Sequence, residues 1–163
     1  MKPHLRDIVV CLLACAGLTP AKSQVFGLDR HTVTVQVVPI TDIQIIGGGV
    51  SLDINNSSAI AGQDMMTVTD QSTSIRWATN SANRKITVAT DLAVPLFALK
   101  LLAVAPTQGA AGPEVILTTT ASDLLLNIGR STGIAALRYT GVAYASQGTG
   151  TDNHVITFTI QSQ

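Results

Sequence analysis

Charged side chains are scarce in this sequence. They make up 12% of its 163 residues, about half the share of an ordinary soluble domain, and the formal net charge is zero. Without a basic surplus, the chain lacks the electrostatic footprint of a nucleic-acid-binding protein. Aromatic residues contribute only 4%, yet the apolar share of 46% is too high for a disordered chain. No apolar run is long enough for a membrane-spanning helix.

Groups that carry out catalysis are also missing. No serine stands in a Gly-x-Ser-x-Gly motif, and Glu114 is the single glutamate. Beyond residue 23 the histidines are His31 and His154, each at the start of a predicted strand. The glycine run 47–49 lacks the lysine and the helix of a phosphate-binding loop, and predicts a turn or bulge. We therefore expect a non-enzymatic protein with no catalytic residues, no cofactor and no metal.

Calcium is the one ligand for which the spacing of oxygen-bearing residues resembles a known binding motif. The spacing of Asp53, Asn55, Ser57 and Asp64 resembles that of a calcium loop. However, Ser58 stands where the sharp turn needs glycine, and Asp64 replaces the bidentate glutamate. A turn built by local Asn and Ser hydrogen bonds is the alternative interpretation.

Residues 1–23 have the pattern of a secretory signal peptide. Basic residues precede an apolar stretch from Ile8 to Leu18, and small residues flank Lys22 before a cleavage site after Ser23. Both cysteines lie within this segment, so the exported chain would contain none. The sequence Leu12–Cys15 also resembles a lipoprotein box, which makes lipidation of Cys15 the alternative. We predict a secreted, extracellular or cell-surface protein, with a periplasmic location as the alternative.

The rest of the chain is predicted to be one β domain over residues 31–163, preceded by a short N-terminal arm over residues 24–30. Apolar residues alternate with polar ones at a period of two from residue 31 onward. We call residues 31–38 the valine segment, because Val33, Val35 and Val37 share one face of this predicted first strand.

Further strands follow at short intervals. They are predicted over residues 43–46, 65–69, 74–79, 84–90, 96–104, 114–119, 135–145 and 154–160, and Val50, Leu52 and Ile54 share one face. The segments 74–79 and 84–90 are expected to form one hairpin, and the last two strands another. Residues 122–128 predict a capped helical turn. Nine or ten short strands with at most one short helix predict an all-β, immunoglobulin-like two-sheet sandwich.

Trp77 is the single tryptophan and falls on a predicted strand beside Ile75. The first interpretation is a core residue of the sandwich. The alternative is a stacking platform for a sugar, which would make the protein a small extracellular carbohydrate-binding module. Such platforms usually combine several aromatic rings, and this chain offers few.

The scarcity of charge persists after the signal peptide is removed. Nine acidic and seven basic residues remain, because Asp7, Lys2, Arg6 and Lys22 all lie within residues 1–23. Lysine is one of the residues that protect sheet edges from pairing with other chains, so edge protection is weak here. The valine segment, with Val33, Val35 and Val37, could therefore be donated as a strand to another subunit. An ordinary first strand in its own sheet is the alternative.

Three stretches resemble segments of small secreted bacterial surface β-sandwiches. They are the N-terminal Thr/Val strand, residues 77–80 leading to residues 85–88, and the closing residues 154–160. Pilin subunits and WxL-type cell-surface proteins are the named groups that the chain resembles. It lacks the usual cysteine pair of chaperone–usher pilins and a clear pair of Trp-x-Leu motifs. The resemblance implies a fimbrial or adhesive surface protein whose partners are its own copies or other surface proteins.

Overall fold

The structure is a computed structural model that describes residues 29–163. The predicted signal peptide, Cys15 and residues 24–28 of the arm lie outside the described residues. The chain divides into two compact units, residues 1–36 and residues 37–163. All the strands described belong to the second unit. Among the residues described, no helix is long and apolar enough to cross a membrane.

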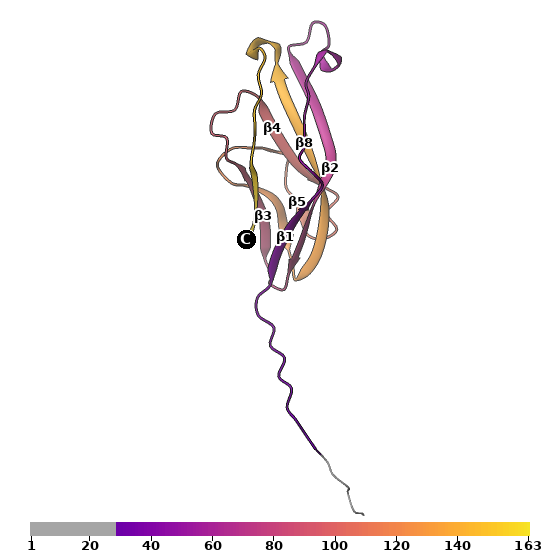
Figure 1. The fold of residues 1–163 in the computed structure, drawn as a ribbon, viewed down its shortest axis with the longest axis vertical. Helices are drawn as coiled ribbons and strands as arrows, with labels where there is room; N and C mark the ends of the chain where they lie inside the picture. Colours follow the sequence, from indigo (N-terminus) through magenta and orange to yellow (C-terminus); the bar gives the residue numbers. More distant parts are fainter. Residues whose placement is uncertain (1–28) are drawn as a thin grey trace, which may run out of the picture. The chain divides into compact units, whose positions relative to one another are not determined.

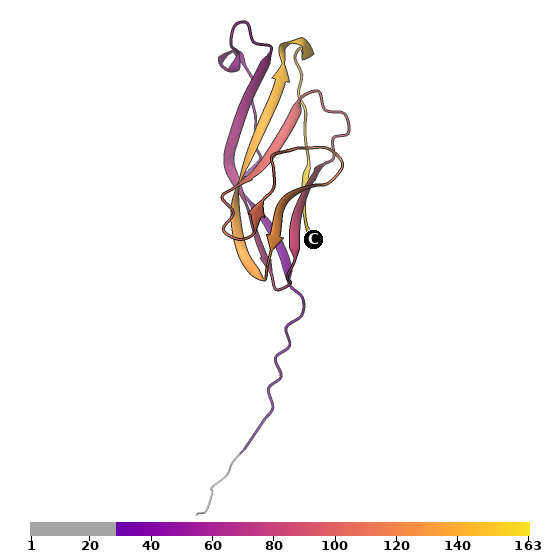
Figure 2. The ribbon, with the colours of Figure 1, turned by 180° about the vertical axis from the view of Figure 1, so that it is seen from behind.

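Two antiparallel sheets make up the second unit (Figures 1 and 2). Sheet A has the strand order β1-β2-β8-β4-β6 and sheet B the order β5-β7-β3-β9. The strands of sheet A are β1 (Thr41–Ile46), β2 (Met65–Thr79), β8 (Ser131–Tyr144), β4 (Ala98–Val104) and β6 (Val115–Ile116). Those of sheet B are β5 (Ala110–Ala111), β7 (Ser122–Ile128), β3 (Arg84–Thr90) and β9 (Ile156–Ser162). The predicted all-β, two-sheet sandwich is confirmed.

The core lies where the inner faces of the two sheets meet. Ile75, Leu101 and Leu137 from sheet A are fully buried, as are Ile86 and Leu124 from sheet B. Burial of each such side chain stabilises the fold by about 1.5–3 kcal/mol. No cysteine occurs beyond residue 23, so residues 37–163 fold through packing and backbone hydrogen bonds without a disulfide.

The strands predicted over residues 65–69 and 74–79 form one long strand, β2. A register shift between Asp70 and Thr73 marks a bulge in its pairing with β8. At the bulge, Ser72 donates to the Asp70 carboxylate from its backbone nitrogen (2.9 Å) and its hydroxyl (2.7 Å). These hydrogen bonds hold the pKa of Asp70 below its usual range. The polar residues 70–72 therefore close a local bulge inside the strand instead of separating two strands.

Both predicted hairpins are wrong. β2 belongs to sheet A and β3 to sheet B, so the short connection over residues 80–83 carries the chain from one sheet to the other. β8 and β9 are likewise in different sheets and do not pair. In a sandwich, consecutive strands can change sheet as easily as they can pair, and period-two patterning is the same in both cases.

The helical turn predicted over residues 122–128 is also wrong, because this segment is strand β7. It lies between β5 and β3, and Leu124 and Leu125 are both fully buried. Its apolar run therefore reflects burial inside the sandwich and not one face of a helix. The predicted central strand over residues 96–104 is confirmed as β4, between β8 and β6.

The sequence predicted that the valine segment is the first strand of the domain, and this prediction is wrong. Residues 31–38 have no strand pairing among the residues described, and the first strand begins at Thr41. The Asn80 side chain marks the end of the pairing: its Oδ1 accepts from the Ile40 nitrogen (2.8 Å) and its Nδ2 donates to the Val38 carbonyl (2.8 Å). Asn80 thus continues the ladder of β1 to Val38, where it stops.

The substitution Asn80→Ala is expected to lower the free energy of unfolding by about 1 kcal/mol, because it removes two half-exposed hydrogen bonds. The measurement is urea unfolding of the full chain. Asn56→Ala is the matched control, since the Asn56 side chain makes no hydrogen bond to the residues described. Equal stability of the two variants would contradict the role given to Asn80.

Candidate functional site

One half of sheet A extends beyond sheet B. β2 and β8 contain 15 and 14 residues, whereas β3, β7 and β9 contain seven each. Sheet B therefore covers the sheet A half around Ile75 and Leu137, and leaves the half around Met66 and Ala143 without a facing sheet. Two extended segments, residues 49–55 and 149–155, lie over this second half.

A cavity of about 1080 Å³, which we call the open groove, lies between these two segments. β2, β4 and β8 of sheet A form its floor, and residues 49–55 and 149–155 form its two walls. The floor is largely apolar, with Met66, Leu99 and Ala143 among its side chains. No lysine or arginine lines the groove among residues 29–163.

The first wall starts at a turn after β1. Gly47 has a φ of +115°, and a Cβ there would come 2.7 Å from Cγ2 of Thr73, so the turn requires glycine. Beyond it, Val50, Leu52 and Ile54 are half-buried and their neighbours are exposed. Leu52 packs over Gly141 of β8. A Cβ at this glycine would lie 3.4 Å from Cδ1 of Leu52. The face predicted for these three residues is confirmed, although residues 49–54 form no strand.

The second wall leads directly into β9 and is fixed by side chains. The Asp152 carboxylate accepts from the Phe97 nitrogen (2.8 Å), and the Asp91 carboxylate accepts from the Val155 nitrogen (2.8 Å). The Thr90 hydroxyl and His154 Nδ1 lie 3.0 Å apart. These contacts tie residues 152–155 to the C-terminal end of β3 and to the residue before β4.

The backbones of the two walls are paired only at their ends, where the Val155 carbonyl accepts from the Asp91 nitrogen (3.1 Å) and the Asn55 carbonyl accepts from the Ser58 nitrogen (2.9 Å). Within residues 29–163, neither 49–54 nor 149–154 makes a backbone–backbone hydrogen bond to another segment. Residues 49–54 of the first wall and 151–155 of the second nevertheless alternate half-buried and exposed side chains, as strands of a sandwich do. Each wall therefore has the pattern of a strand without the ladder, a state that favours pairing with an added strand.

Tyr139 lies on the floor of the open groove and is 6% exposed. Desolvation by burial is the main cause that raises the pKa of its phenol above the ordinary value near 10. Tyr139 therefore stays neutral throughout the physiological pH range, and the floor of the groove carries no phenolate.

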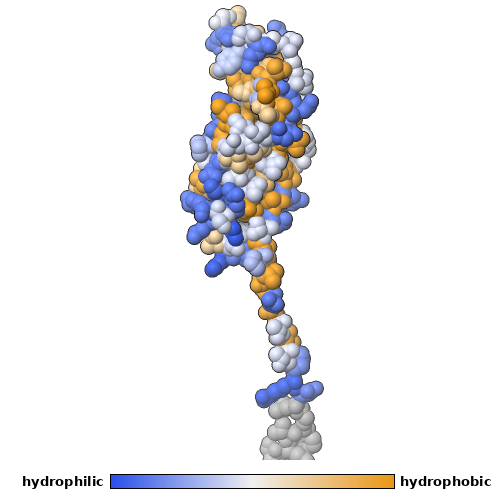
Figure 3. Space-filling model, turned by 90° about the vertical axis from the view of Figure 1, so that its left-hand side faces the viewer, coloured by the Kyte–Doolittle hydropathy of each residue, from blue (hydrophilic) through white to orange (hydrophobic). Residues whose placement is uncertain are grey.

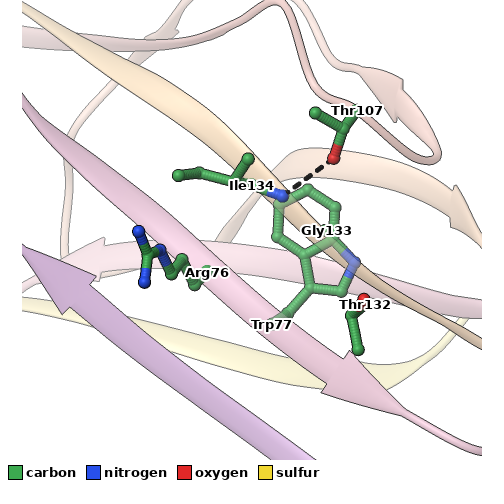
Figure 4. Close-up of a pocket in the computed structure, with 6 residues that line it drawn as sticks. All are labelled: Arg76, Trp77, Thr107, Thr132, Gly133 and Ile134. Carbon is green, nitrogen blue, oxygen red and sulfur yellow. Dashed lines mark hydrogen bonds between the residues drawn. The ribbon is translucent and has the colours of Figure 1, made fainter.

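Trp77 lies in the core, next to a shallow pocket of about 360 Å³ (Figure 4). Its side chain is 3% exposed, and its ring packs over Gly133, which is its register partner on β8. Beside the ring, the Thr107 hydroxyl accepts from the Ile134 nitrogen (3.0 Å). A sugar stacks on an exposed ring face, and the buried ring of Trp77 does not present one.

The residues considered for calcium accept hydrogen bonds from other groups of the chain. Asp53 accepts from the Ser51 hydroxyl (3.4 Å), and Asn55 caps the short 3₁₀ turn η1 (Asn56–Ser58). Asp64 accepts from the Ser146 nitrogen across a loop contact (3.3 Å). Within residues 29–163, no three His, Cys, Asp or Glu side chains are grouped so that they could hold a metal.

The remaining predicted site residues are the three valines and Cys15. Val33, Val35 and Val37 are exposed by 71%, 82% and 70%, and none of them lies in a strand. Cys15 lies outside the described residues. Sequence reasoning missed the open groove, although the unpaired alternation at Val50, Leu52 and Ile54 indicated its first wall.

No protein-family model matches the chain, and no curated protein sequence matches it. The geometry of the molecule is therefore the basis for assigning its function.

The substitution Gly133→Ala is expected to lower the free energy of unfolding by about 1–3 kcal/mol, because the added Cβ would overlap the six-membered ring of Trp77. Gly129→Ala is the control, since a Cβ there meets no atom within 4 Å. Urea unfolding followed by Trp77 fluorescence measures both variants. An unchanged midpoint for Gly133→Ala would show that the ring does not pack on this glycine.

Proposed function

We propose that this protein is a secreted, non-enzymatic structural or adhesive surface protein whose copies assemble into fibres by β-strand addition. The observation that carries the proposal is the valine segment. Its apolar and polar residues alternate as in a half-buried strand, yet it has no strand partner among residues 29–163 and its valines are exposed. The segment buries its apolar face only by joining another sheet.

The distribution of charge supports assembly. The three ion pairs among the described residues join Lys85 to Asp123, and Lys100 and Arg138 to Glu114. The edge strand β9 contains no charged residue, and neither do residues 32–38. Edges without charge are open to strand addition, and two uncharged segments do not repel each other.

The surface of the molecule is also consistent with weak protection against pairing with other chains. On the face drawn in Figure 3, apolar residues reach the surface between hydrophilic ones instead of being covered by a continuous hydrophilic layer. The most exposed apolar side chains of residues 37–163 include Val94 and Val155. A low-charge surface of this kind favours contacts with other copies or with other surface proteins.

The location follows from the signal peptide predicted over residues 1–23. After cleavage at Ser23 the protein would reach the cell surface or the medium of a bacterial cell, with its valine segment close to the new N-terminus. Lipidation of Cys15 would instead hold it in the periplasm. The intact mass of the exported chain distinguishes these two routes.

The exported full chain is expected to form oligomers in size-exclusion chromatography, a ladder on an unboiled gel and filaments by electron microscopy. Val35→Asp should weaken assembly by about tenfold or more, since it places an unpaired carboxylate on the face to be buried. Thr34→Asp is the control, because Thr34 points to the opposite face of the strand. A clean monomer at high concentration would refute the proposal.

A further inference from the structure

We infer that the open groove binds a neutral long-chain amphiphile, a small molecule with an apolar tail and an uncharged hydroxyl or carbonyl head. The tail lies along the apolar floor, and the head meets two buried hydroxyl groups of β2 and β8. Residues 31–38 do not line the groove, so the site is separate from the valine segment and goes beyond the proposed function.

The open groove has the size and the lining of a small-molecule site. Ligand pockets commonly enclose about 300–1,000 Å³ and are lined mainly by apolar side chains with a few polar groups. The groove encloses about 1080 Å³. Its apolar lining comes from the floor, from both walls and from β9, and includes Val50, Leu52, Met66, Phe97, Leu99 and Phe158. An apolar tail in the groove is therefore removed from water along its length, and each buried methylene adds to its affinity.

Two hydroxyl groups on the floor lack a hydrogen-bond partner. Thr73 of β2 is 3% exposed, and its Oγ1 makes no hydrogen bond within residues 29–163. The phenol of the buried Tyr139 lies close enough to Thr73 to interact with it, but the two oxygens form no hydrogen bond of ordinary geometry. Buried polar groups are almost always hydrogen-bonded. Because a hydroxyl can both donate and accept, this pair suits the oxygen of a bound alcohol or carbonyl.

The floor selects a head group without charge. Burial raises the pKa of the Tyr139 phenol, so the phenol is neutral at physiological pH. No lysine or arginine lines the groove within residues 29–163, so an anion finds no partner there. A charged head against this floor would lose its water without gaining a counter-charge, and such burial is strongly unfavourable.

The titratable side chains other than Tyr139 lie on the walls of the groove. Asp53 belongs to the first wall and Asp152 to the second, and both carboxylates already accept a hydrogen bond from the chain. His154 Nδ1, on the second wall, lies 3.0 Å from the Thr90 hydroxyl. The charged groups are therefore placed away from the floor, where the head group of the ligand is held.

The test is isothermal titration calorimetry of the full exported chain with 1-decanol. Every sample carries Val35→Asp, so that binding is measured on a monomer whether or not the unmodified chain assembles. We expect saturable binding with a Kd of about 100 µM or tighter. Decanoate and decyltrimethylammonium, which combine a similar tail with a charged head, should bind at least about tenfold more weakly.

A pair of tyrosine variants tests the contact with the head group. Tyr139→Phe keeps the ring and removes the hydroxyl, and it should weaken decanol binding about fivefold. Tyr144→Phe is the matched control and should leave the affinity unchanged, because Tyr144 is exposed and does not line the groove. Thr73→Val removes the second hydroxyl at nearly constant volume and should weaken binding by about the same factor. Urea unfolding checks that each variant is folded.

Methyl NMR spectra locate the bound molecule. The methyl resonances of Leu52 and Leu99 should shift when decanol is added, and those of Ile128, which is buried outside the groove, should not. Shifts centred on Ile128, no saturable binding, equal affinity for the neutral and charged amphiphiles, or equal affinity of Tyr139→Phe and Tyr144→Phe would each overturn the site. None of these results bears on assembly, whereas a monomeric unmodified chain would overturn the proposed function and leave the site standing.

Discussion

The edge strand β9 is hydrogen-bonded on one side only, and this half-paired backbone is the constraint on which the rest of the molecule depends. Its half-buried side chains pack against the core, while its outward N–H and C=O groups have no strand partner among residues 29–163. On the far side of the open groove, residues 49–54 make no backbone hydrogen bond to another segment among residues 29–163. Two segments with the alternation of strands therefore flank the apolar floor of the open groove.

This arrangement follows from unequal strand lengths. The buried residues Ile75, Leu101 and Leu137 hold the two sheets together at one half of the sandwich, through packing alone. At the other half the long strands β2 and β8 continue without sheet B above them. The turn at Gly47 takes the chain out of sheet A there, so β1 does not continue along β2. The packed core and the open groove therefore occupy different halves of the same domain.

Period-two patterning was sufficient to predict the fold class. Alternation around Val50 and along residues 154–160 correctly identified inward-facing side chains, and the doubly apolar run at 96–104 correctly predicted a central strand. Pairing could not be predicted in the same way, because alternation is identical whether a strand joins its neighbour in sequence or crosses to the other sheet. For the same reason the valine segment was predicted as a first strand: its sequence specifies a strand but not which sheet, or which molecule, it pairs with. The open groove arises between segments about 100 residues apart in sequence, and no local pattern indicates such a contact.

Residue-resolved hydrogen exchange gives the most direct test of strand addition during assembly. The comparison is between assembled protein and the Val35→Asp variant as the monomer, with exchange quenched before the amides are read. The N–H groups of Ile156 and Phe158 should exchange rapidly in the monomer and become protected on assembly. Those of Thr157 and Thr159, already bonded to β3, should be protected in both and so provide an internal control. Unchanged, rapid exchange of Ile156 and Phe158 in filaments would contradict strand addition at β9.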